Sequence, residues 1–386
     1  MPARHTPEAL RAWLRLSLEP GLRPADALAL LAAAGLPEQI YDSGAAALAR
    51  VVPQTLARQL AAAPPADVSS RIDAAVDWAA VPGHDVLTLA DRDYPGALLN
   101  LPDPPPLLYV QGDPAALSRP AIAVVGARSA TAGGLADARA FAHHLAGQGW
   151  CIVSGLARGI DAAAHEGALQ AGPQGGGTVA VLGTGIDIVY PAGNRPLAER
   201  IGGQGALVSE FALGAPPLPH QFPRRNRLVA GLARGVLVVE AARQSGSLST
   251  ARLAAEQGRE VFAIPGSIHS PLSRGCHALI RQGAKLVETA QDITDELGAP
   301  DGGRAAVPAP ASPGRGRPRA AAHPVLDALG YDPLPFDTLQ ARCGLDTAEL
   351  QAQLLQLELE GRIARLDGGS FQRLPEPAPG GDAHMP

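Results

Sequence analysis

Seven short apolar runs between residues 107 and 266 constrain most strongly how this chain can fold. They read LLYV, AIAVVG, CIVSG, TVAVLG, ALVSE, GVLVVEA and VFAIPG. Strands that are covered on both faces are apolar along their whole length, whereas half-exposed strands alternate with polar residues. Helical stretches separate the runs, as in parallel strands joined by crossover helices. We therefore expect an α/β fold with a doubly wound, mostly parallel sheet over residues 81–297.

A helical region of alanine and leucine at helical spacing occupies residues 1–80. Its segment LSLEPGLRPADALALLAAAGLPEQIY has the outline of a helix-hairpin-helix or SAM-like unit. Such a unit either holds a DNA backbone through its turn or serves only as a small packing domain. The turn carries a single basic residue, Arg23, so we favour the packing role.

A proline-, glycine- and alanine-rich segment at residues 298–321 cannot bury a core, and we interpret it as a flexible linker. Residues 322–374 then follow the winged-helix order of helix, helix, turn, helix and two short strands, and residues 375–386 are expected to be a disordered tail. The third helix of this winged helix is acidic, which opposes contact with phosphate. We therefore favour a protein-contact role for this domain. The acidic residues are Asp346, Glu349, Glu358 and Glu360.

Positive charge is concentrated in the middle of the chain. The whole sequence has a formal net charge of -5, yet residues 121–288 contain 15 Lys+Arg against 10 Asp+Glu. Because local charge decides where an anion docks, the middle region is the candidate for binding a polyanion.

The sequence also indicates the compartment. Its three cysteines are odd in number and far apart, which fits neither a disulfide framework nor a zinc site. The N-terminus has no apolar signal core, and no run reaches the roughly 18 apolar residues of a membrane span. We therefore expect a cytoplasmic protein with no bound metal and no membrane contact.

Polar and glycine residues follow the carboxyl ends of several expected strands, where open parallel sheets bind ligands. Glycine allows close approach to the backbone, hydroxyls cap helices, and free N–H groups at helix starts attract phosphate. A further cluster, FPRRNRLVAG, places arginines where a helix begins. Together these positions predict an extended phosphate-binding surface. The turn residues are Gly126, Arg128, Ser154, Gly155, Arg158, Gly183, Thr184, Gly185, Asn194, Ser245, Gly246, Ser247 and Thr250.

Cofactor motifs are missing from these turns. The first turn, GARSATAGG, is not G-x-G-x-x-G, and the chain has no G-x-x-x-x-G-K-[ST] loop, so we expect neither a dinucleotide nor another cofactor. Asp161 and Asp187 could act as acid or base groups, but their place after glycine turns favours helix capping. His165 and His269 are isolated. We expect no catalytic residue.

These motifs, in this order, resemble the DNA-processing protein A family, also called DprA or Smf. The resemblance covers about residues 85–290 and includes SGLARGIDAAAH, LGTGIDIVYPAGN, FPRRNRLVAGLARGVLVVEA and SGSLSTARLA. It implies a Rossmann-like core that binds single-stranded DNA, forms a homodimer and loads RecA recombinase in natural transformation. It also implies that no reaction is catalysed, and that the two flanking domains are variable additions.

The resemblance assigns roles to particular residues. Arg128 takes the place of the DNA-contacting arginine after the first strand. Ala192 stands where many relatives have a basic residue, so Arg195 is expected to supply that charge. Either Phe222 or Tyr190 is expected to stack a base. The glycine turns carry over to Ser154, Gly155, Gly183, Thr184 and Gly185, and the basic helix start carries over to Arg224, Arg225, Asn226 and Arg227. Alternatively, some of these arginines pair with Glu210 or Glu240 and fix the helix.

Two alternative functions remain open from the residues. Nucleoside-monophosphate phosphoribohydrolases of the LOG family have the same kind of fold and use the turn P-G-G-x-G-T-x-x-E. Here Thr250 is followed by Arg252 and Leu253, with no acid before Glu256. The other alternative is a nucleotide-sensing regulator. Binding of oligonucleotides without turnover of AMP separates the first interpretation from these two.

Overall fold

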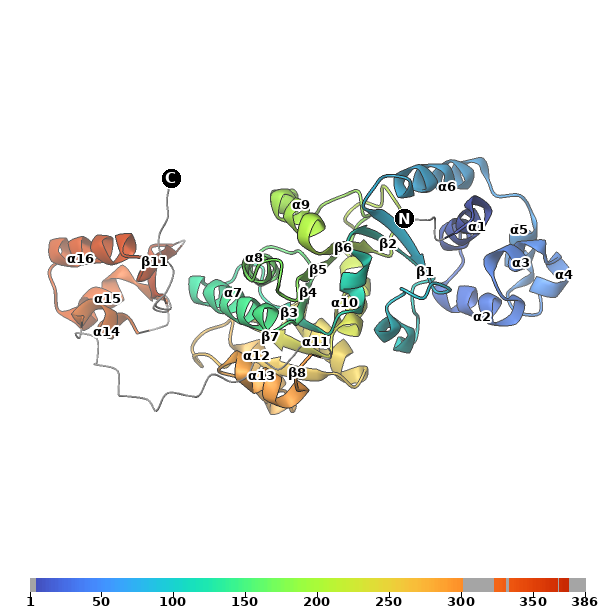
Figure 1. The fold of residues 1–386 in the computed structure, drawn as a ribbon. Helices are drawn as coiled ribbons and strands as arrows, with labels where there is room; N and C mark the ends of the chain where they lie inside the picture. Colours follow the sequence, from blue (N-terminus) through green and yellow to red (C-terminus); the bar gives the residue numbers. More distant parts are fainter. Residues whose placement is uncertain (1–4, 301–322, 331–332, 367, 375–386) are drawn as a thin grey trace.

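The computed structural model describes residues 5–300, 323–330, 333–366 and 368–374 (Figure 1). Most of the expected linker, and all of the expected tail at 375–386, lie outside these residues. The described chain comprises N-terminal helices, a central α/β unit and a C-terminal winged helix.

A nine-stranded sheet forms the centre, in the order β1-β2-β6-β5-β4-β3-β7-β8-β9. In the part of this order that runs β6-β5-β4-β3-β7-β8-β9, each strand pairs in parallel with its neighbours. Strand β2 pairs antiparallel with both β1 and β6. The seven apolar runs became β2 to β8, which confirms the mostly parallel doubly wound sheet. The strands are β1 (His84–Thr88), β2 (Leu107–Gly112), β3 (Ala121–Val125), β4 (Cys151–Ser154), β5 (Thr178–Val181), β6 (Ala206–Ser209), β7 (Gly235–Val238), β8 (Glu260–Ala263) and β9 (Lys285–Leu286).

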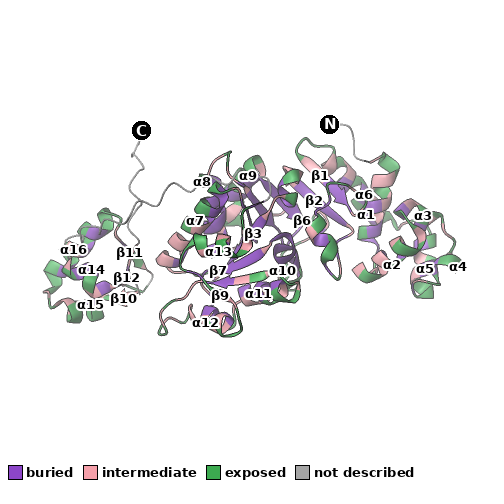
Figure 2. Cartoon of the chain, turned by 60° about the horizontal axis from the view of Figure 1, so that its bottom comes forward, coloured by how far each residue is buried: buried purple, intermediate pink, exposed green. Residues whose placement is uncertain are grey.

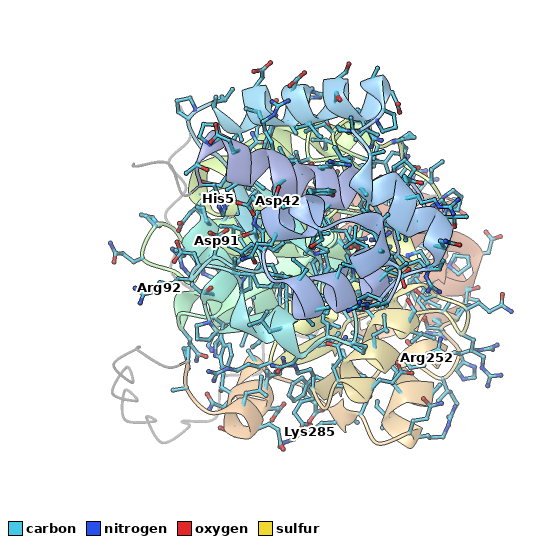
Figure 3. All side chains as sticks on the ribbon, turned by 90° about the vertical axis from the view of Figure 1, so that its right-hand side faces the viewer. His5, Asp42, Asp91, Arg92, Arg252 and Lys285 are labelled. Atoms are coloured by element: carbon cyan, nitrogen blue, oxygen red, sulfur yellow. The ribbon has the colours of Figure 1, made fainter. Side chains whose placement is uncertain are left out.

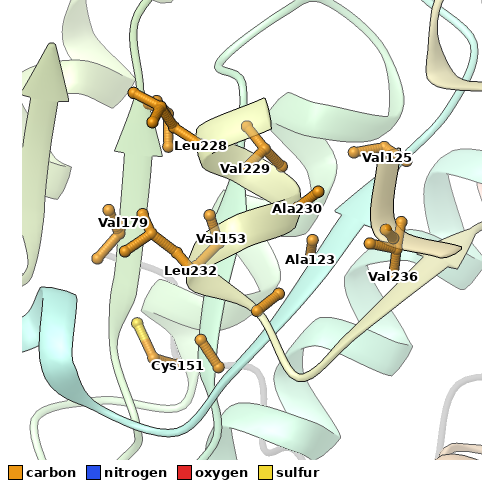
Figure 4. Packing of buried hydrophobic residues seen from close by; sticks show 14 of the residues in the cluster. Ala123, Val125, Cys151, Val153, Val179, Leu228, Val229, Ala230, Leu232 and Val236 are labelled. Carbon is orange, nitrogen blue, oxygen red and sulfur yellow. The ribbon is translucent and has the colours of Figure 1, made fainter. Parts of the chain in front are cut away.

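Helices cover both faces of this sheet, as continuous apolar strands require. One hydrophobic core joins α10, α11 and α12 to the sheet, and the other joins α7, α8 and α13. In Figure 4, Leu232 of α10 lies beside the strand residues Val153 and Val179, and Leu228 lies one turn nearer the start of the helix. The strands are the buried centre of the cartoon in Figure 2. The helices are α7 (Ala132–Gly147), α8 (Ile160–Gln170), α9 (Arg195–Gln204), α10 (Gln221–Leu232), α11 (Ser247–Glu256), α12 (Arg274–Arg281) and α13 (Ala290–Leu297).

The N-terminal helices are not packed separately from the sheet. Leu14 of α1 and Ile72 of α6 share a hydrophobic cluster with Tyr109 of β2. Apolar contacts therefore connect the N-terminal helical region, residues 1–80, to the sheet of the central unit. Trp13 of α1 belongs to a second cluster, made mostly by the N-terminal helices, against which Leu89 after β1 also packs. Arg23, in the first turn, donates to Asp26 at 2.7 and 2.9 Å. The helices are α1 (Pro7–Leu18), α2 (Pro24–Ala34), α3 (Pro37–Asp42), α4 (Ala45–Leu48), α5 (Gln54–Ala61) and α6 (Ala66–Ala79).

The winged-helix unit has its own hydrophobic cluster, which includes Leu339, Leu354 and Phe371. Its third helix, α16, begins at an acidic cap, where the Asp346 side chain accepts from the Glu349 N–H at 2.8 Å. A hydrogen bond connects this unit to α7, because Gly133 N donates to Gln372 Oε1 at 3.0 Å. The elements are α14 (Pro324–Leu329), β10 (Leu334–Pro335), α15 (Phe336–Cys343), α16 (Thr347–Leu359), β11 (Ile363–Leu366) and β12 (Ser370–Arg373).

Within the described ranges, none of the helices has both the length and the apolar character needed to cross a bilayer.

Candidate nucleic-acid interface

A cavity of about 760 Å³ opens at the carboxyl ends of β3, β4 and β7. We call it the strand-end cavity. Its walls come from the turns after these strands and from the first turns of α10 and α11, so it lies where parallel sheets place their ligands. Of the predicted site residues, ten line it: Gly126, Arg128, Gly155, Phe222, Arg225, Asn226, Ser245, Gly246, Ser247 and Thr250.

Arg225 supplies a buried cation at this cavity. It is 6% exposed, and its Nη1 donates to the carbonyl oxygen of Val181 at 2.6 Å. Its Nε donates to Asn226 Oδ1 at 3.2 Å. Burial lowers the pKa of Arg225, and the nearby carboxylate of Asp161 opposes this shift. Guanidinium keeps its proton even after such a shift, so the cavity wall carries a fixed positive charge in a poorly solvated place.

The absence of a side chain at Gly155 leaves space for the guanidinium of Arg225. A Cβ at residue 155 would lie 2.0 Å from Nη1 of Arg225 and 2.3 Å from its Cζ. Only a residue without a side chain therefore leaves room for the guanidinium beside the turn after β4. This requirement, rather than close approach of a ligand alone, explains the glycine in SGLARG.

Asp161 braces the same turn. Its Oδ2 accepts from the backbone N–H groups of Gly155 at 3.1 Å and Ala157 at 3.3 Å. Burial raises the pKa of Asp161, while Arg225 and the two N–H groups oppose the rise. These bonds hold the turn after β4 and do not cap the helix, because the N-cap residue of α8 is Gly159 and no side chain caps this helix. Among the described residues that line the strand-end cavity, Asp161 is the only acid.

The rim of the cavity combines a cation with two aromatic rings. Arg128 is exposed, and its Cζ lies 5.9 Å from the centre of the Phe222 ring. The Phe222 and Tyr190 ring centres are 5.6 Å apart, and Tyr190 is 47% exposed. A Cβ at Gly183 would approach Phe222 to 2.8 Å, so this glycine seats the ring. The rim therefore offers both a phosphate contact and surfaces on which a base can stack.

The turn before α11 presents hydroxyl groups to the cavity. Ser245 and Ser247 share a hydrogen bond of 2.7 Å between their Oγ atoms. Asn226 Nδ2 donates to Ser249 Oγ at 3.1 Å, which ties the start of α11 to α10. Thr250 lies one turn further along and is buried.

Arg224 and Arg227 lie outside this cavity and meet a carboxylate instead. Arg224 Nη2 donates to Glu210 Oε2 at 3.0 Å, and Arg227 also donates to that oxygen. Arg227 further donates to the carbonyl oxygen of Asp103 at 2.8 Å. Of the three arginines in FPRRNR, Arg225 alone lines the strand-end cavity, whereas the sequence-based prediction took them together as one phosphate-binding group. Glu210 is buried, so the alternative of an arginine pairing with it describes Arg224 and Arg227.

The remaining predicted positions do not line the cavity, and several of them hold the turns. Ser154 Oγ donates to the Val124 carbonyl at 2.7 Å, and Thr184 Oγ1 to the Ile188 carbonyl at 2.5 Å. Asn194 Nδ2 donates to the Leu156 carbonyl at 2.9 Å. A Cβ at Gly185 would meet Asp187 Oδ1 at 2.5 Å. Arg158 and Arg195 are exposed and lie beyond the lining.

Sequence reasoning missed some residues of the cavity. Gln244, Ser249 and Leu272 line it, although none of them was among the predicted site residues. It also offered Glu240 as an arginine partner, whereas Glu240 Oε2 accepts from Thr131 N at 2.9 Å and so fixes the start of α7. Spacing along the chain gives no signal for these contacts. Among the residues that the structure describes, no group of three or more His, Cys, Asp or Glu side chains could hold a metal ion.

Comparison with known proteins decides the family. Residues 85–298 match the sequence profile described as DNA recombination-mediator protein A, and residues 306–369 match the DprA winged helix domain. Protein Smf of Escherichia coli K12 is 43% identical over 314 residues, which are 77% of this chain and 80% of that protein. The chain belongs to the DNA recombination-mediator protein A family.

Two solved DprA structures share the fold. DprA from Streptococcus pneumoniae superposes with a TM-score of 0.62 at 38% identity, covering 74% of this chain and 95% of that one. DprA from Helicobacter pylori, whose structure is described as revealing a single-stranded DNA binding mode, gives a TM-score of 0.50 at 32% identity, covering 55% and 95%. The resemblance to this family expected from the motifs is confirmed, and the phosphoribohydrolase alternative is not favoured.

Proposed function

We propose that this DprA-family protein binds single-stranded DNA in the strand-end cavity. The observation that carries the proposal is the buried guanidinium of Arg225 on the cavity wall, with exposed Arg128 and the Phe222 ring at the rim. A phosphate that enters would replace the water that burial removes from Arg225, and the rings would receive bases without selecting a sequence. The H. pylori relative, described as binding single-stranded DNA, supports the same ligand.

The shape of the site favours a single strand over a duplex. The cations lie in a cavity at the ends of strands, whereas duplex readers place a basic helix or ribbon in the major groove. The helix that would take this part in the winged-helix unit, α16, carries Glu349 and Glu358 on its exposed surface. Its charge would repel the phosphates of a duplex.

We extend the proposal to the role of the bound strand. By resemblance to its family, the protein protects incoming DNA in the cytoplasm, acts as a homodimer and loads RecA recombinase during natural transformation. It catalyses no reaction and uses no cofactor. The support for these finer statements is the family match over residues 85–298.

A binding titration tests the ligand. The full-length protein is titrated with a fluorescent single strand and with the matching duplex, each at several salt concentrations. We expect preference for the single strand and a linear fall of log K with log salt, which reports phosphate contacts. Equal affinity for both forms at every salt concentration would remove the proposal.

A second experiment tests the finer role and the alternatives. Formation of RecA filaments is followed on single-stranded DNA coated with single-strand-binding protein, with and without this protein. Faster filament formation in its presence is the expected result. Release of adenine from AMP is measured on the same preparation. Turnover of AMP, together with no effect on RecA, would favour a phosphoribohydrolase.

A further inference from the structure

A second cavity of about 710 Å³ lies between α11 and α12, beside the start of β8. We call it the α11/α12 groove. Gln244, Ser245 and Ser249 line both this groove and the strand-end cavity, so the two spaces meet at the turn before α11. From that turn the groove follows α11, whose ten residues extend for roughly 15 Å.

The groove is lined by three arginines that were not among the predicted site residues. Arg243 stands at the end nearest the strand-end cavity, Arg252 lies on the exposed side of α11, and Arg259 precedes β8. Figure 3 shows Arg252 at the molecular surface. In the lining as the structure describes it, Glu260 is the only acid, so positive charge exceeds negative.

These cations are poorly neutralised by the protein itself. Across the described parts of the chain, neither Arg243 nor Arg252 takes part in an ion pair. Arg259 Nη2 makes one long hydrogen bond, 3.5 Å to the Gly231 carbonyl, and its Nε is buried without a partner. Three arginines along one groove that lack a carboxylate partner indicate an anionic ligand from outside.

The floor of the groove is apolar. Leu248 and Leu279 from the two helices and Val261 of β8 line the groove, together with Gln244 and Gln282. An extended chain with regularly spaced negative charges and flat apolar groups matches such a lining, because its phosphates meet the arginines while its sugars and bases cover the leucines. A compact anion would leave most of this groove unfilled.

We propose that the α11/α12 groove binds the continuation of the single strand that occupies the strand-end cavity. The strand passes from Arg128 and Arg225 over the turn at Ser245 and runs along α11, where Arg243, Arg252 and Arg259 contact its phosphates. This inference rests on the proposed function of the strand-end cavity. Its consequence is that affinity grows with strand length beyond what the first cavity can hold.

The test uses the full-length protein and oligothymidylates from about 4 to about 20 nucleotides long. The variant carries Arg243→Gln, Arg252→Gln and Arg259→Gln together. For the longest strand we expect its affinity to fall roughly tenfold or more, with the salt slope reduced by about 0.7 for each phosphate that an arginine no longer neutralises. For the shortest strand, its affinity should match that of the unchanged protein.

A matched control removes the same charge elsewhere, through Arg50→Gln, Arg58→Gln and Arg71→Gln, which are exposed positions of the N-terminal helical region. It should bind strands of every length as the parent does. Should the groove variant melt at a lower temperature, the pair Arg243→Gln and Arg252→Gln replaces it, because both side chains are exposed and their loss leaves the core intact.

Results other than the expected length-dependent loss of affinity would overturn the inference. Unchanged affinity for long strands, or an equal loss at every length, means that the groove is not a separate extension of the site. A change in oligomeric state by light scattering with unchanged DNA affinity makes the groove an interface between copies. If the parent protein binds no strand of any length, the proposed function falls as well, which distinguishes that failure from failure of the groove alone.

Discussion

The two sides of α10 use arginine in opposite ways. Arg225 points to the strand-end cavity, where its contacts are a backbone carbonyl and a neighbouring amide, and its charge is left to attract a ligand. Arg227 points to Glu210 and to the carbonyl of Asp103, where the protein itself supplies the compensating oxygens. Two positions along a helix are about 200° apart around its axis, so the two side chains cannot face the same ligand.

The difference shows that a basic cluster in a sequence does not define a binding site. A buried arginine beside a buried carboxylate completes an ion pair and adds little net charge to its surroundings. Arg225, by contrast, is buried on a cavity wall, and the carboxylate of Asp161 near it accepts from backbone N–H groups. This arrangement leaves a positive potential in the cavity. The predictions below separate these two roles.

The largest effect is expected from removing the cavity cation. Arg225→Met should lower affinity for single-stranded DNA by about a hundredfold, because a charge-assisted contact in a poorly solvated site is worth about 1.5–3 kcal/mol. Gly155→Ala should have a similar effect without changing the charge, since its Cβ displaces the guanidinium. Fluorescence anisotropy measures both, and circular dichroism verifies the fold. Binding at the parent's strength by both variants would make Arg225 a structural residue.

The next effect is on stability rather than binding. Arg227→Met leaves the buried carboxylate of Glu210 with Arg224 alone, and we expect a loss of about 2 kcal/mol in the free energy of unfolding. Adding Glu210→Gln should restore part of the lost free energy of unfolding, because the double variant has no charge at residue 210 that needs a partner. Urea unfolding gives both values. A fully stable Arg227→Met protein with weakened DNA binding would reverse the assignment of the two sides of α10.

A smaller effect is expected at the rim. Arg128→Ala should weaken single-strand binding by roughly tenfold or less, because an exposed phosphate contact gains little over solvent. The salt slope should fall by about 0.7, and the loss should be the same for every base sequence. Titrations of several homopolymers at a series of salt concentrations measure this. Parental binding and slope at every concentration would remove Arg128 from the interface.

The smallest effect is expected from Arg224→Ala. This side chain is 45% exposed and pairs with Glu210 from outside the strand-end cavity. Stability should change by less than about 1 kcal/mol, as for other exposed ion pairs. Affinity for a single strand should change less than about twofold. A tenfold loss of affinity, measured beside Arg225→Met, would restore the interpretation of FPRRNR as one phosphate-binding group.

The sequence alone determined the architecture of the central unit. Apolar runs and the helical stretches between them predicted β2 to β8. Strands that are buried on both faces are apolar along their whole length, so each of them appears in the sequence as a continuous apolar run. Two strands carried no such signal. His84–Thr88 is partly polar, and Lys285–Leu286 is a two-residue, exposed edge strand. The antiparallel direction of β2 was also not readable, since a buried strand looks the same in either direction.

The sequence also identified the turns that build the candidate site, because glycines and hydroxyls at strand ends follow from local backbone chemistry. Only the tertiary structure decided which of these residues face the cavity. Ser154, Thr184 and Asn194 turn their polar groups to nearby carbonyls, and Gly155 serves a guanidinium that lies 70 positions later in the chain. The partner of each arginine depends on which carboxylate the fold brings within hydrogen-bond distance. That is a long-range property, and neither composition nor spacing contains it.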